Sequence, residues 1–134
     1  MKVKAISLHE PWASLMRAGH KHNETRSWPT SHRGPLLICA AKTQAGLTAD
    51  TEFMIPLLPD PPLNFGKAVA LVNLVACEPT TIAAKDLKER PFGDYSPGRF
   101  AWITVPIDTA FTPFPVKGRQ GFFTVDVPKG TFKI

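Results

Sequence analysis

The chain has 134 residues, of which 43% are hydrophobic and 20% are charged, so it is long enough to bury a core and has an ordinary globular composition. Its 14 prolines argue against an all-helical fold, and no apolar run approaches the ~20 residues of a membrane span. The formal net charge of +5 favours a negatively charged partner, and nucleic acid is the first candidate.

The first third of the chain predicts a strand, a short helix and two further strands. Residues 3–8 (VKAISL) are rich in β-formers and predict a strand. Residues 10–20 predict one helix, with Gly19 suited to its C-terminal cap. Residues 23–28 predict a short strand or extended segment, and the apolar run at 35–42 predicts a strand that is buried on both faces.

The rest of the chain predicts mainly strands. Residues 56–62 (PLLPDPP) predict a surface loop, because such prolines cannot join a central sheet. The longest β-type run, at 67–78, is the expected central strand. A short helix is expected at 81–90, and two alternating strands at 100–108 and 121–128.

These elements predict one domain over residues 1–134, of the α+β class. About five or six strands and two or three short helices would form a small curled or barrel-like mixed sheet. No signal-peptide pattern opens the chain, so we expect a cytoplasmic protein. Cys39 and Cys77 lie in apolar runs and are expected to be buried, reduced thiols. We expect no metal and no cofactor, since His20 and His22 have no second pair of ligands to match them.

The predicted helix has one apolar face. Trp12, Leu15 and Met16 fall at i, i+3 and i+4, so all three are expected to be largely buried. Trp12 lies at the start of the helix, where part of its ring can still border a site and contact a ligand.

Residues 19–30 (GHKHNETRSWPT) are the main candidate for a functional site. In an extended segment alternate side chains share a face, which places Glu24, Arg26 and Trp28 together. Lys21 is expected to join them in one concavity. Arg26 suits a phosphate or a base edge, Glu24 can accept from an exocyclic amine or act as a base, and Trp28 offers a stacking face. The alternative is a solvated, charge-rich loop with Trp28 in the core.

Two basic stretches are further candidates. Lys117 and Arg119 flank a glycine ahead of an aromatic pair and can form a phosphate-contacting loop, or an ordinary hairpin turn. Arg33, followed by Gly34, can likewise contact a phosphate or belong to an ordinary turn.

One set of residues in the first third of the chain forms a long and specific motif: Pro11, Trp12, Ala13, Gly19, Lys21, Glu24, Arg26, Trp28, Arg33, Gly34, Pro35 and Leu36. On these residues the chain resembles the ASCH domain family, which has a PUA-like small mixed β-barrel. The resemblance covers most of the chain outside the proline-rich loop and departs from the family pattern at Glu10, where glutamine is common, and at Cys39, where histidine is common.

The resemblance implies a cleft beside the first helix and a partner that is RNA or a modified nucleoside or nucleotide. Two kinds of function stay open. One is an RNA- or nucleotide-binding module. The other is an enzyme, either a ribonuclease on single-stranded RNA with Lys21 and Glu24 as catalytic residues, or an amidohydrolase that deacetylates N4-acetylcytidine-like nucleosides. In the related amidohydrolase a threonine stands where this chain has Glu24, and Glu78 is the nearest match to its later glutamate.

Overall fold

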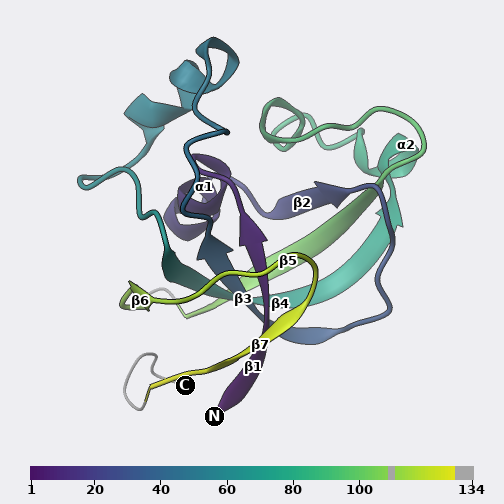
Figure 1. Cartoon of the computed structure of the whole chain (residues 1–134). Coiled ribbons are helices and arrows are strands. Elements are labelled where there is room, and N and C mark those ends of the chain that lie inside the picture. The colour runs from purple at the N-terminus through teal and green to yellow at the C-terminus, as the bar shows by residue number, and fades with distance from the viewer. Residues whose placement is uncertain (109–110, 129–134) are drawn as a thin grey trace.

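A seven-stranded mixed sheet forms the centre of the computed structural model, which describes residues 1–108 and 111–128 (Figure 1). The strands pair in the order β2-β5-β4-β3-β1-β7, and β6 pairs with β4. Within the described residues, β1 and β3 pair in parallel and the other ladders are antiparallel. The strands are β1 (Lys2–Leu8), β2 (Asn23–Arg26), β3 (Gly34–Ala40), β4 (Lys67–Pro79), β5 (Phe100–Asp108), β6 (Phe114–Pro115) and β7 (Phe123–Asp126).

The α+β class is confirmed, and two details of the prediction are corrected. The six predicted strands are present, and the seventh is β6, a two-residue strand inside the expected turn region. The prolines of this turn region hide any alternating pattern. Barrel closure is not confirmed, because β2 and β7 end the pairing order and no ladder joins them within the described residues.

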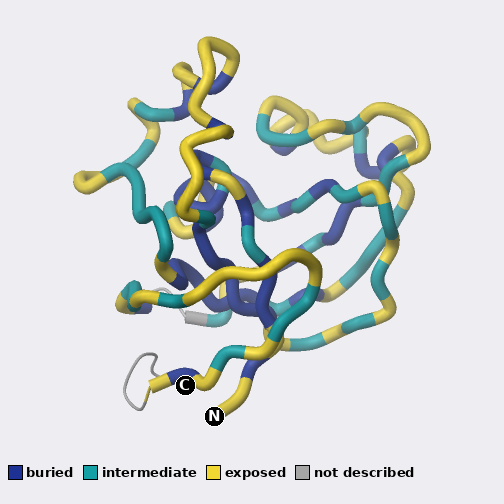
Figure 2. Tube along the Cα trace, viewed as in Figure 1, coloured by how far each residue is buried: buried dark blue, intermediate teal, exposed yellow. Residues whose placement is uncertain are grey.

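Both faces of the central strands are buried, as predicted for β3. Leu36 and Ile38 belong to one apolar cluster, whereas Leu37 and Cys39 belong to a second cluster on the opposite face. Irregular pairing in β3 and β4 marks β-bulges, which bend strands and increase their twist. The sheet therefore curls around its core, with the exposed chain concentrated in the connections (Figure 2).

Helix α1 (Trp12–Ala18) packs on the sheet much as its sequence predicts. Gly19 caps it in the left-handed conformation, with φ at 84°. Leu15 and Met16 are buried, but Trp12 is only half-buried because the first turn borders a cleft.

The other helical segments are shorter than expected. Helix α2 (Thr80–Ala83) ends early, and turns lead from it to the 3₁₀ helix η2 (Arg90–Phe92). The long β3–β4 connection holds a second 3₁₀ helix, η1 (Ala49–Leu57), and residues 56–62 lie at the surface as predicted. In the described part of the chain no helix has the length and apolarity needed to cross a membrane.

The two cysteines are free thiols, as expected, and both lie in the described part of the chain. Cys39 is fully buried, and burial raises the pKa of its thiol to about 12. Cys77 is only half-buried at the edge of the core, so the expectation of burial holds for Cys39 alone.

A buried carboxylate joins α1 to the β3–β4 connection. Glu10 is fully buried and accepts hydrogen bonds from the Ser14 N–H at 2.8 Å, the Ser14 hydroxyl at 2.5 Å and the Asn64 N–H at 2.6 Å. The Asn64 amide also donates to the Ser14 hydroxyl. This carboxylate satisfies one backbone donor in α1 and one near the end of the β3–β4 connection, which ties the returning chain to the helix.

Glu10→Gln is expected to lower the free energy of unfolding by about 2 kcal/mol, the usual cost of an unmade buried hydrogen bond. An amide has one acceptor oxygen, so either the Ser14 N–H or the Asn64 N–H loses its partner. Urea denaturation measures the change. Glu52→Gln, at an exposed position on η1, is the control and should be neutral; equal stability of the two variants would contradict the assignment.

Candidate functional site

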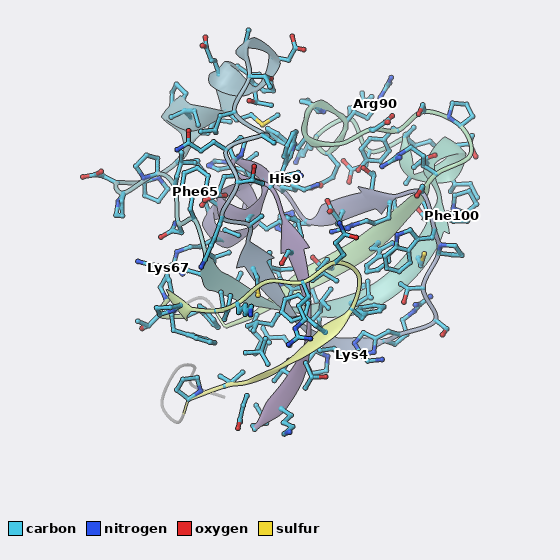
Figure 3. The ribbon with its side chains drawn as sticks, in the orientation of Figure 1. Lys4, His9, Phe65, Lys67, Arg90 and Phe100 are labelled. Carbon is cyan, nitrogen blue, oxygen red and sulfur yellow. The ribbon has the colours of Figure 1, made fainter. Side chains whose placement is uncertain are left out.

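A cleft of about 1470 Å³ opens where the parallel strands β1 and β3 end. Its walls come from β2, the start of α1, η1, the η2 loop and residues 117–121. Figure 1 shows the η1 segment and the loop after α2 rising on opposite sides of this end of the sheet. His9, which follows β1 and lines the cleft, lies between them in Figure 3.

Strand β2 contributes the charged wall, in which partly exposed Glu24 and Arg26 alternate with buried Asn23 and Thr25. Glu24, Arg26 and Trp28 all line the cleft. The Arg26 Nε donates to Glu24 Oε2 at 3.1 Å, and its Nη2 donates to the Ser7 carbonyl oxygen of β1 at 2.9 Å. The guanidinium therefore joins β2 to β1 across the cleft floor.

Lys21 lies behind this wall, and its predicted place in the concavity is corrected. Its side chain is 1% exposed and does not line the cleft. The ammonium lies 3.4 Å from Glu24 Oε1 and donates to the carbonyl oxygens of Asn23 and Phe92. Three acceptors thus match the three N–H donors of the ammonium, and one acceptor, the Phe92 carbonyl oxygen, belongs to η2.

A second buried carboxylate, missed in the sequence, fixes the start of β2. Glu89 accepts from the backbone N–H groups of His22 and Asn23 at 2.8 to 3.1 Å. It also lies 3.3 Å from the His22 ring nitrogen. No local pattern signals this role, since Glu89 lies in a stretch predicted simply as a short helix.

The loop after η2 is fastened to the other side of β2. The Asp94 N–H donates to the Thr25 hydroxyl at 3.1 Å, and the Arg99 guanidinium donates to the Thr25 carbonyl oxygen at 3.2 Å. The Asn23 amide donates to the Tyr95 hydroxyl at 3.3 Å. Asp94 and Arg99 line the cleft, so this loop forms a wall of the cleft that is anchored to β2.

Aromatic rings supply the apolar part of the cleft. Trp28 packs edge-on against buried Trp102, with 4.7 Å between ring centroids, and the Trp102 indole donates to the Trp28 carbonyl oxygen. Phe53 of η1 and Phe92 of η2 stack at 6.3 Å across the cleft. With half-buried Trp12, these side chains give the cleft several ring faces.

The two basic candidate stretches have different positions. Lys117 and Arg119 are exposed and line the cleft. Gly118 between them lies on Ser7, and a Cβ there would be 2.8 Å from the Ser7 hydroxyl oxygen, so the loop approaches the floor closely. Arg33 does not line the cleft, and it donates to nearby backbone carbonyl oxygens instead.

Among the described residues, no three His, Cys, Asp or Glu side chains gather closely enough to hold a metal ion.

Comparisons with known proteins give one family. The ASCH domain model matches residues 6–112. Activating signal cointegrator 1 of Homo sapiens is 30% identical over 131 residues, and the Mus musculus protein of that name is 29% identical. Each match covers 90% of this chain and 22% of the relative, so the chain spans about a fifth of the length of these relatives.

Lys21→Met is expected to lower the free energy of unfolding by about 3 kcal/mol, the typical cost of removing one partner of a buried ion pair. The substitution leaves Glu24 without its buried cation and two carbonyl oxygens without a donor. Urea denaturation is the measurement. Lys88→Met, at an exposed position outside the cleft, is the control and should be neutral. A Lys21→Met protein as stable as this control would show that the ammonium is not a structural contact.

Tyr95 should titrate late. Burial raises the pKa of its hydroxyl to about 12 from the ordinary value of 10, nearby Glu89 adds to the rise, and the Asn23 hydrogen bond opposes it. The folded state thus holds a proton that the unfolded state releases, so stability falls as the pH rises from 10 to about 12. Tyr95 is the only tyrosine, so tyrosinate absorbance reports it alone. A folded protein that titrates like the urea-unfolded chain would contradict this environment.

Proposed function

We propose, from the premise that the chain belongs to the ASCH domain family, that it binds single-stranded RNA in the cleft. The observation that carries the proposal is the combination of cations and aromatic rings around one cavity. Among the described residues, five Lys or Arg side chains line the cleft against three acidic ones. The cations are Arg26, Lys42, Arg99, Lys117 and Arg119, and the acids are Glu24, Asp50 and Asp94.

The distribution of the charges favours a polyanion. Glu24 is paired with Lys21 and Arg26, and Asp94 is paired with Arg99 at 3.5 Å. Lys42, Lys117 and Arg119 form no ion pair with any described residue. Their positive charge is therefore available to phosphates, while most of the acidic groups are already neutralised.

The size of the cleft favours an oligonucleotide over one nucleoside. Pockets for drug-sized molecules usually measure about 300–1,000 Å³, and this cleft measures about 1470 Å³. An amidohydrolase acting on N4-acetylcytidine needs only a pocket for one nucleoside. The volume supports a strand segment with several bases in contact with the aromatic rings.

Binding is proposed ahead of catalysis because of Lys21. A lysine acts as a nucleophile or base only after losing a proton, and here three acceptors hold the ammonium away from the cleft. A ribonuclease that uses Glu24 as its base is the alternative. RNA recovered from the binding mixtures and run on a denaturing gel separates the two: intact strands support binding, and shortened strands support cleavage.

Lys117→Ala/Arg119→Ala should weaken the binding of single-stranded RNA and make it less dependent on salt. For single strands, the slope of log K against log salt has a magnitude of ~0.7 for each phosphate that the protein neutralises, so the slope of the double variant should be shallower by ~1.4. Fluorescence anisotropy with a labelled oligouridine measures both the affinity and the slope. Lys85→Ala/Lys88→Ala is the matched control, since both lysines are exposed and lie outside the cleft.

Undetectable binding by the parent protein at low salt would overturn the proposal. An equal decrease in affinity in the two double variants would mean that general basicity, rather than the cleft, attracts the RNA.

A further inference from the structure

We infer that the wall formed by Glu24 and Arg26 is a subsite for a guanine base; the inference rests on the proposed binding of RNA in the cleft. The two side chains are neighbours on the cleft face of β2. They are only partly exposed, at 14% and 22%, and each is fixed by more than one contact. Such a wall can select a ligand, because its polar groups cannot turn away to water.

Glu24 presents two acceptors side by side. An ionised carboxylate accepts hydrogen bonds and donates none, with about four lone-pair positions on its two oxygens. Oε1 contacts Lys21 and Oε2 contacts Arg26, so one described contact engages each oxygen. Each oxygen keeps a further lone pair that can accept from an N–H donor.

Arg26 places its Nε donor beside Glu24 Oε2 and keeps further donors on the same guanidinium. Its guanidinium has five N–H groups, and the described contacts use Nε toward Glu24 and one Nη2 hydrogen toward the Ser7 carbonyl oxygen. The Nη1 group makes no hydrogen bond with any described residue. The wall therefore combines a carboxylate with two acceptor oxygens and a guanidinium that keeps N–H donors in reserve.

Guanine has complementary groups on its Watson–Crick edge. The N2 amine and N1–H are adjacent donors that match the Glu24 oxygens, and O6 is an acceptor that matches Arg26. Adenine and cytosine each offer the carboxylate one donor, their amine, next to an acceptor ring nitrogen. In uracil the one N–H lies between two carbonyl oxygens, so a carboxylate oxygen would face a carbonyl.

The surroundings suit a nucleotide. One carboxylate between the cations Lys21 and Arg26 leaves a local charge of about +1, so Glu24 does not repel the phosphates beside the base. Trp28 lines the same cleft and is held by its packing against Trp102. It offers a fixed face against which the base can stack.

Three pentanucleotides test the inference on the parent protein: UUGUU, UUIUU with inosine, and UUAUU. Inosine differs from guanosine only by the missing N2 amine, so it removes one donor and leaves shape and stacking nearly unchanged. UUGUU should bind about tenfold tighter than either of the others, within the usual range for a bidentate base contact. Fluorescence anisotropy at one fixed salt concentration gives the ratio.

Glu24→Gln should remove this preference, leaving the three affinities within about twofold, because an amide presents only one acceptor. Glu78→Gln is the matched control: Glu78 is partly buried on β4, lies outside the cleft, and should keep the preference of the parent. Equal binding of UUGUU and UUIUU by the parent overturns the guanine subsite and leaves the proposed function intact. If no RNA binds, both fail.

Discussion

The ion pairs between buried Lys21 and partly buried Glu24 and Arg26 hold the cleft together. Strand β2 is an edge strand: in the described part of the chain it pairs with β5 alone, through the residues from Asn23 to Arg26. The two cations of these ion pairs connect β2 to two further segments. Arg26 donates to the Ser7 carbonyl oxygen of β1, and Lys21 donates to the Phe92 carbonyl oxygen of η2. Buried charges are tolerated only when they are paired and hydrogen-bonded. Removal of any one of these groups therefore affects three segments of the wall together.

The same arrangement explains how charged residues can serve an RNA-binding surface. Acidic groups in such a cleft would repel phosphates, but Glu24 and Asp94 each have a cationic partner. The basic residues that have no ion-pair partner among the described residues are exposed, where they can meet the backbone of the RNA. Trp12, Trp28 and the Glu24–Arg26 wall are partly buried in the same cleft. Under the proposed function, phosphate contacts and base contacts thus belong to different side chains.

Sequence patterns predicted the structural features that depend on residues close together along the chain. The period of two placed Glu24 and Arg26 on one face, and the apolar run at 35–42 correctly predicted a strand buried on both faces. The burial of Lys21 could not be predicted, because the Phe92 carbonyl oxygen that it contacts lies 71 positions away. The cap that Glu89 provides for β2 depends on a contact of similar range. Strand β6 escaped prediction because two residues are too few to show a period.

The claim that the cleft is the RNA-binding surface is tested most directly by mapping the binding surface residue by residue. Titration of ¹⁵N-labelled protein with UUGUU, followed by amide chemical shifts, gives that map. Shifts should concentrate at Gly93, Gly118 and Gly121, which line the cleft, and be absent at Val75 and Val105, which are exposed on β4 and β5 outside it. Shifts confined to Val75, Val105 and their neighbours, with the three glycines unchanged, would contradict the account.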